Sequence, residues 1–181
     1  GKTMQLAAAG HRVTALDRSE SRLGRLQQNL ARTRLAAELV VADALSWTPP
    51  ALVDAVLLDA PCSATGTFRR HPEVLHRASS AIIRDSANLQ RSLVNRALSW
   101  LKPGGTLVYA VCSLEPDEGE SVIRAALKAH PGLRVQSPEP AELPSPVMPT
   151  AEGFVRVLPG MLEQEGGLDG FFIARLVRSG A

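Results

Sequence analysis

The sequence predicts an α/β fold built on a mostly parallel β-sheet. Short apolar segments that suit strands alternate with longer amphipathic segments that suit helices. Three predicted strands end in an aspartate, and a fourth ends in a cysteine. The length of 181 residues is enough for one domain with a sizeable core. Because ligands of parallel sheets bind beyond the carboxyl ends of the strands, these four end residues are the first candidates for a functional site.

The first half of the chain is predicted to contain three strands and one helix. The strands are expected at residues 12–17, 37–43 and 54–59, which end in Asp17, Asp43 and Asp59. Ser19 suits the N-cap of the helix after the first strand, because its hydroxyl can accept a backbone hydrogen bond. An isolated acid after a strand is commonly a cap or turn residue, so it is the recurrence at one sheet edge that indicates a site.

The second half continues the alternation. A long loop at 60–71 precedes a helix at about 78–101. The residues Lys102-Pro103-Gly104-Gly105 predict a turn that leads into a strand at 106–112, which ends at Cys112. The remaining elements are a helix, a short strand, a proline-rich crossover and a closing strand, expected at residues 115–129, 133–136, 138–149 and 171–177.

Composition and charge exclude some classes and leave others open. No apolar run approaches the ~20 residues that span a bilayer, so no membrane partner is expected. The two cysteines, Cys62 and Cys112, form no metal-type cluster, and neither His71 nor His76 has a partner at metal-ligand spacing. We therefore expect no metal, reduced thiols and a cytoplasmic location. The net charge of +2 does not by itself indicate nucleic acid. Six arginines between Arg69 and Arg96 suit either phosphate contacts or a solvated helix face.

The start of the chain suits the end of a cofactor-binding loop. A carboxylate at the end of the second strand of a nucleotide-binding sheet typically accepts ribose hydroxyls, and Asp17 fits that role. Gly1-Lys2-Thr3 suits the tail of the glycine-rich loop before such a strand. The same three residues also suit the end of a Walker phosphate loop, although no Mg²⁺ site follows in the sequence.

Two cysteine motifs carry the strongest chemical signal. The first is Asp59-Ala60-Pro61-Cys62-Ser63-Ala64-Thr65-Gly66, and the second is Tyr109-Ala110-Val111-Cys112-Ser113-Leu114-Glu115-Pro116, with Glu118 and Glu120 beyond it. Together with Lys102–Gly105 and the closing Asp169-Gly170-Phe171-Phe172, they resemble the Sun/RsmB family of RNA cytosine-C5 methyltransferases. The resemblance covers nearly the whole chain. It implies a Rossmann-like fold that uses S-adenosylmethionine, an antiparallel last strand, and an RNA substrate, which for bacterial members is ribosomal RNA.

The chemistry of that reaction suits a pair of cysteines. C5 of cytosine is a poor nucleophile, so a thiolate must first add to C6, and a cysteine with an ordinary pKa of about 8.5 must be activated for this. Spacing alone does not order the two cysteines. The resemblance assigns the nucleophile to Cys112 and assistance in product release to Cys62. It also implies that Asp59 contacts the cytosine edge and the methionine part of the cofactor, and that Asp43 contacts the adenine amino group.

Departures from the family pattern leave alternatives open. Val111 stands where threonine is common, and Ala64 replaces a common glycine. The fold's first strand should precede Gly1, so we expect residues 1–181 to be a catalytic domain truncated at its N-terminus that binds cofactor poorly alone. A non-catalytic RNA-binding or ribosome-assembly module and a transfer-RNA methyltransferase remain alternatives. An adenine amino-methyltransferase is disfavoured, because Asp59-Ala60-Pro61-Cys62 replaces the Asn/Asp-Pro-Pro-aromatic motif expected of such enzymes.

Overall fold

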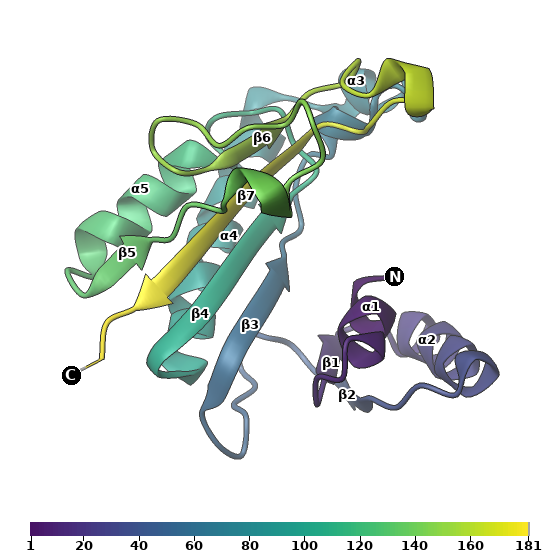
Figure 1. Cartoon of the computed structure of the whole chain (residues 1–181), viewed down its shortest axis with the longest axis vertical. Helices are drawn as coiled ribbons and strands as arrows, with labels where there is room; N and C mark the ends of the chain where they lie inside the picture. The colour runs from purple at the N-terminus through teal and green to yellow at the C-terminus, as the bar shows by residue number, and fades with distance from the viewer. Residues whose placement is uncertain (181) are drawn as a thin grey trace. The chain divides into compact units, whose positions relative to one another are not determined.

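The computed structural model describes residues 1–180, and the chain divides into two compact units, Gly1–Thr48 and Pro49–Ala181 (Figure 1). The first unit contains two parallel strands and two helices: α1 (Lys2–Ala8), β1 (Thr14–Asp17), α2 (Glu20–Thr33) and β2 (Glu38–Val41). Ser19 caps α2 as predicted, because its hydroxyl accepts a hydrogen bond from the Arg22 amide at 3.3 Å. The short helix α1 was not predicted from the sequence.

The second unit is built around a five-stranded sheet: β3 (Val53–Asp59), β4 (Leu101–Val111), β5 (Leu133–Val135), β6 (Val155–Val157) and β7 (Phe171–Arg178). The order is β3-β4-β7-β5, with β6 also paired to β7. Strands β3 and β4 are parallel, whereas β7 runs antiparallel to β4, β5 and β6. The predicted α/β class, with parallel pairing and an antiparallel last strand, is therefore confirmed.

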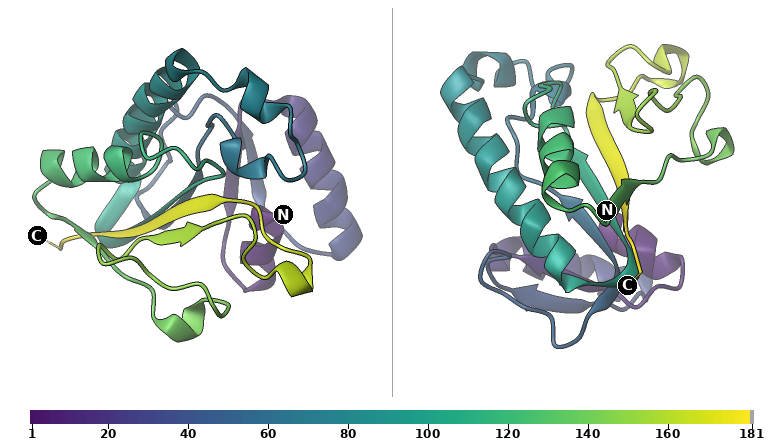
Figure 2. Two further views of the ribbon diagram at one scale, coloured as in Figure 1. Left: turned by 90° about the horizontal axis from the view of Figure 1, so that it is seen from above. Right: turned by 90° about the vertical axis from the view of Figure 1, so that its left-hand side faces the viewer.

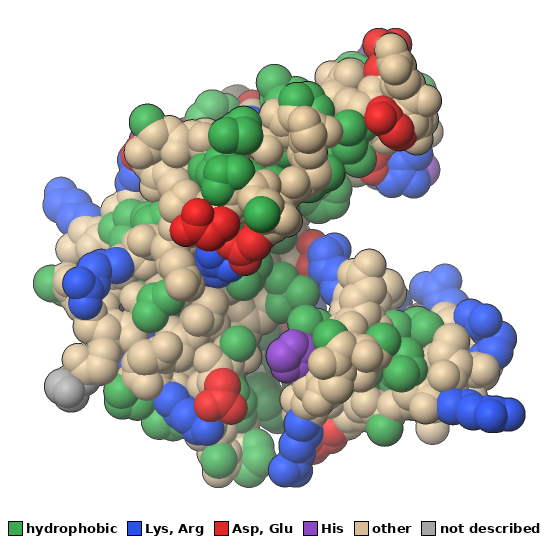
Figure 3. Space-filling model, in the orientation of Figure 1, with side chains coloured by type: hydrophobic (Ala, Val, Ile, Leu, Met, Phe, Trp, Pro, Cys, Tyr) green, Lys and Arg blue, Asp and Glu red, His purple; other side chains and the backbone are tan. Residues whose placement is uncertain are grey.

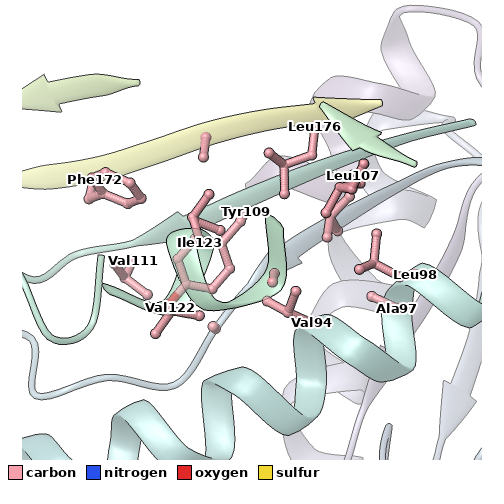
Figure 4. Packing of buried hydrophobic residues seen from close by; sticks show 14 of the residues in the cluster. Val94, Ala97, Leu98, Leu107, Tyr109, Val111, Val122, Ile123, Phe172 and Leu176 are labelled. Carbon is pink, nitrogen blue, oxygen red and sulfur yellow. The ribbon is translucent and has the colours of Figure 1, made fainter. Parts of the chain in front are cut away.

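Two long helices cover one face of this sheet. The helices α4 (Ser80–Trp100) and α5 (Glu120–Ala129) lie on the same side of β4 and β7 (Figure 2). Alternate residues of the two strands point toward them, so Tyr109 and Phe172 are buried in one cluster with Val94 and Ile123 (Figure 4). Burying side chains of this size contributes about 1.5–3 kcal/mol each, and this fixes the strands that carry the functional residues.

Short elements complete the second unit. They are the helix α3 (Val74–Arg77) and the 3-10 turns η1 (Thr65–Thr67), η2 (Pro140–Glu142) and η3 (Glu163–Glu165). None of these four elements was predicted, and neither was β6. Among the described residues, no helix is both long enough and apolar enough to cross a membrane.

One sequence-based boundary was wrong, and one predicted turn falls within the bounds of a strand. Residues Lys102–Gly105 belong to β4, but across them the β3–β4 register jumps from the pair Val53–Leu101 to the pair Ala55–Thr106, and Gly104 takes a left-handed conformation with φ 78°. The chain therefore turns at these residues as expected, and regular pairing of β4 with β3 begins at Thr106. The helix expected from Glu115 begins only at Glu120, since backbone hydrogen bonds from Glu118 and Gly119 close turns onto Glu115 and Pro116.

Candidate active site

The two cysteine motifs meet beyond the carboxyl ends of adjacent parallel strands. Asp59 ends β3 and pairs with Ala110 of β4, one residue before the end of β4 at Val111. The chain then continues from both strands on the same side of the sheet, so the segments after Asp59 and after Val111 lie together. The Gly66 amide donates to the Cys112 carbonyl at 3.0 Å and ties the first segment to the second.

The parallel register brings the two thiols into contact. Cys62 Sγ and Cys112 Sγ are 3.6 Å apart, and both side chains are half-buried and free of disulfides. The hydrogen bond to Cys112, burial and the charge on Cys112 together raise the pKa of the Cys62 thiol well above its ordinary value. A raised pKa favours the protonated form of Cys62, whereas the contact between the two sulfurs does not fix which of them donates.

A buried carboxylate joins the residues that follow the two cysteines. Glu118 is 0% exposed, and it accepts hydrogen bonds from the Ser63 amide at 2.8 Å and the Ser63 hydroxyl at 2.5 Å. It also accepts from the Ser113 hydroxyl at 2.5 Å and from Gln90 Nε2 at 3.3 Å. Sequence reasoning quoted Glu118 in the second motif but gave it no role. No local pattern in the sequence indicated that this acid would be buried.

Two glycines allow the segments to pack closely. A Cβ on Gly66 would collide with the Gly170 carbonyl, and a Cβ on Gly170 would lie 2.5 Å from Leu114 Cδ2. The Gly170 amide donates to the Gly66 carbonyl at 2.7 Å. The glycines of the Pro-Cys motif and of the closing motif are therefore required by close backbone approach. Ala64, by contrast, takes a left-handed conformation with φ 60°, a region that favours glycine.

The predicted cofactor acids lie together in the first unit. Asp17 and Asp43 follow the parallel strands β1 and β2 at the same edge. Each uses one oxygen locally: Asp17 accepts from the Ser19 amide at 2.8 Å, and Asp43 accepts from the Leu45 amide at 2.9 Å. Both carboxylates remain partly exposed, and their second oxygens form ion pairs with Arg22 at 3.3 Å and Arg18 at 3.8 Å, respectively.

The other residues predicted to bind the cofactor are exposed. Gly1 is the N-cap of α1 and Lys2 is the first residue of that helix, and both are exposed. The side chain of Asp59 is exposed at the end of β3. The structure thus brings the two cysteines together in the second unit. It brings the acids Asp17 and Asp43 together in the first unit.

The arginine-rich stretch is only partly engaged in ion pairs. Arg70 binds Asp169 through two nitrogens, and this lowers the pKa of the Asp169 carboxyl. Arg69, Arg77 and Arg84 are exposed. Exposed basic side chains are also spread around α2 in the first unit (Figure 3). This distribution suits phosphate contacts and an ordinary solvated surface equally well.

Comparison with known proteins identifies the family to which the chain belongs. The family model described as 16S rRNA methyltransferase RsmB/F matches residues 1–177. Ribosomal RNA small subunit methyltransferase B of Thermus thermophilus is 41% identical over 180 residues, which cover 98% of this chain and 42% of that protein. The protein of the same name from Vibrio cholerae is 38% identical over 167 residues, covering 91% and 35%. The chain thus spans about two fifths of the length of these curated relatives.

Solved structures agree in fold. The structure of NSun6 from Pyrococcus horikoshii with SFG superposes with a TM-score of 0.81 and 26% identity, covering 100% of this chain and 46% of that one. A methyltransferase homologue from the same organism gives a TM-score of 0.77 and 29% identity, covering 98% and 58%. The chain has a methyltransferase fold and belongs to the 16S rRNA methyltransferase RsmB/F family.

Proposed function

We propose that this chain carries the catalytic centre of an enzyme that methylates C5 of a cytosine in RNA. The single observation that supports this most is the contact of two free thiols, 3.6 Å apart, beyond adjacent parallel strands. Cytosine C5 methylation needs a thiolate that adds to the ring and later leaves it. A thiolate beside a protonated thiol suits both steps.

The two cysteines have different roles in this proposal. Cys112 adds to C6 of the cytosine, which forms the sulfur–carbon bond and makes C5 electron-rich. After methylation a base accepts the C5 proton, the C5–C6 double bond forms again, and the bond between C6 and sulfur breaks so that Cys112 departs as a thiolate. The two sulfurs are 3.6 Å apart, so in this proposal a protonated Cys62 donates to the negative sulfur of Cys112 before attack and again as it departs.

Asp59 is the acid proposed to recognise the base. It ends the strand three residues before Cys62 and its side chain is exposed at this edge. A hydrogen bond between Asp59 and the amino and N3 edge of cytosine offsets the charge that develops in the ring on addition. A base paired within a duplex is stacked, so the substrate cytosine must be unpaired or flipped out.

S-adenosylmethionine is the proposed cofactor, and it supplies an electrophilic methyl group when bound. The donor set fits its adenosine part, because Asp17 and Asp43 are partly exposed carboxylates at neighbouring strand ends. Asp17 accepts the ribose hydroxyls and Asp43 accepts from the adenine amino group. Gly1 and Lys2 border the same cofactor in this proposal.

The proposed substrate is ribosomal RNA of the small subunit, and this rests on the family description and on the names of the relatives. The test is a map of 5-methylcytosine in total RNA from cells with and without the gene. Loss of one modified cytosine from small-subunit RNA is expected. Loss of a 5-methylcytosine from transfer RNA would show that transfer RNA is the substrate and not ribosomal RNA. An unchanged map would favour a non-catalytic module.

A further inference from the structure

Among residues 1–180, Glu118 is the one acid that is fully buried, and the proposed reaction gives it no role. Its two oxygens accept four hydrogen bonds, which is about the full capacity of a carboxylate. All four come from uncharged donors on Ser63, Ser113 and Gln90. An ion held in this way strongly favours a single geometry, because removing any donor leaves a buried charge less well solvated.

The donors come from both cysteine segments. Ser63 directly follows Cys62, and Ser113 directly follows Cys112. The two serine hydroxyls lie 3.3 Å apart, and Gln90 on α4 also donates to the Pro61 carbonyl at 2.8 Å, next to Cys62. One carboxylate thus joins two segments that are 50 residues apart in sequence to a helix of the core.

We propose that Glu118 is a positioning residue that holds the segments of Cys62 and Cys112 in register, so that the two sulfurs stay in contact. This rests on the proposed function only in treating the thiols as the reacting groups. The buried charge has a second effect. The hydrogen bond to Cys112 and burial are the main causes that raise the pKa of Cys62, and the charge of Glu118 adds to them.

The first test measures geometry without any substrate. In a glutathione redox buffer, two protein thiols and one glutathione disulfide give one protein disulfide and two glutathiones, and mass spectrometry yields the equilibrium constant. Glu118→Ala is expected to lower this constant by about tenfold or more, because the segments are no longer tied. Glu118→Gln should stay within about threefold of wild type, since an amide can accept from the Ser63 amide and donate to hydroxyls.

The second test measures the charge. In a Cys112→Ala background Cys62 is the only cysteine of the chain. Adding Glu118→Gln removes a negative charge, so alkylation of Cys62 by iodoacetamide at pH 8 should become about threefold faster or more, and its pH profile should move to lower pH. A purely structural glutamate would leave that profile unchanged. The matched control is Glu152→Gln, which breaks an exposed ion pair with Arg124 and should change neither readout.

The outcomes decide the proposal. It is overturned if Glu118→Ala, shown to be folded by circular dichroism, keeps the wild-type glutathione equilibrium, or if Glu118→Gln leaves the Cys62 profile in place. If Glu118→Ala does not fold, Ser113→Ala removes one of the four bonds and should lower the equilibrium constant by about threefold, whereas no change would count against the proposal. Neither readout uses RNA or cofactor. An inactive protein with the expected thiol behaviour would therefore refute the proposed reaction and keep the positioning role.

Discussion

Gly66→Ala tests the packing that brings the cysteine segments together. A Cβ at this position would collide with the Gly170 carbonyl and would lie 3.0 Å from the Cys112 carbonyl oxygen. The neighbours are backbone atoms, so they cannot move away as a flexible side chain would. The hydrogen bonds from the Gly66 amide to Cys112 and from the Gly170 amide to Gly66 would both be stretched or lost.

The size of the effect follows from these contacts. Two net hydrogen bonds contribute about 1 kcal/mol each, and forcing an extra carbon into a packed site costs about 1–3 kcal/mol. We therefore expect Gly66→Ala to lower the free energy of unfolding by about 3–5 kcal/mol, measured by urea denaturation. Gly132→Ala is the matched control in the same unit, because its Cβ would meet only Ser179 Cβ at 3.7 Å, an ordinary contact.

The two glycine variants are expected to differ in their free energies of unfolding. Gly132→Ala should stay within about 0.5 kcal/mol of wild type. If Gly66→Ala also unfolds within about 0.5 kcal/mol of wild type, the close approach of the two segments is not a constraint of the fold.

Three further predictions concern the cofactor, the surface and the thiols. Asp17→Ala should weaken S-adenosylmethionine binding by about 1–3 kcal/mol in calorimetry, because charge-assisted bonds to ribose are lost, and unchanged affinity would remove Asp17 from the site. The hydrogen bond from Arg175 lowers the pKa of Glu142 from 4.5 to about 2. The ion pair between them should therefore stabilise the folded state fully above pH 4.5, and this stabilisation should disappear as the pH falls toward 2. Denaturation of wild type and Glu142→Gln across that range should converge at low pH, and a constant difference would contradict the ion pair. With 5-azacytidine-containing RNA, Cys62→Ala should show a covalent band on a denaturing gel and Cys112→Ala should show none. The reverse pattern would exchange the two roles.

The strands and their order of appearance were predictable because their signals are local. Alternating apolar residues and terminal aspartates indicated β1, β2 and β3 to within a few residues. Ser19 was predictable for the same reason, since an N-cap bonds an amide only three residues away. The turn at Lys102–Gly105 was also predictable from local composition, since Gly104 has φ 78° and the β3–β4 register shifts there, although these residues fall within the bounds of β4.

Glu118 could not be recognised from the sequence, because its burial depends on distant residues. It lies between Pro116 and Gly119 in a polar stretch, where an acid would ordinarily face solvent. Its partners Gln90 and Ser63 are 28 and 55 residues away. Only the parallel pairing of β3 and β4, with α4 packed behind them, places donors around that carboxylate.

The same contacts bear on which of the two cysteines is expected to be the nucleophile. Spacing left Cys62 and Cys112 equivalent, since each follows a strand and precedes a serine. Glu118 breaks this symmetry, because it accepts two hydrogen bonds from Ser63 and only one from Ser113. The buried carboxylate is therefore held mainly by the segment of Cys62, and its charge adds to the hydrogen bond to Cys112 and burial, which are the main causes of the raised pKa of Cys62. A thiol with a raised pKa is the poorer nucleophile at neutral pH, so we expect Cys112 to attack, which is the order that the family resemblance implies.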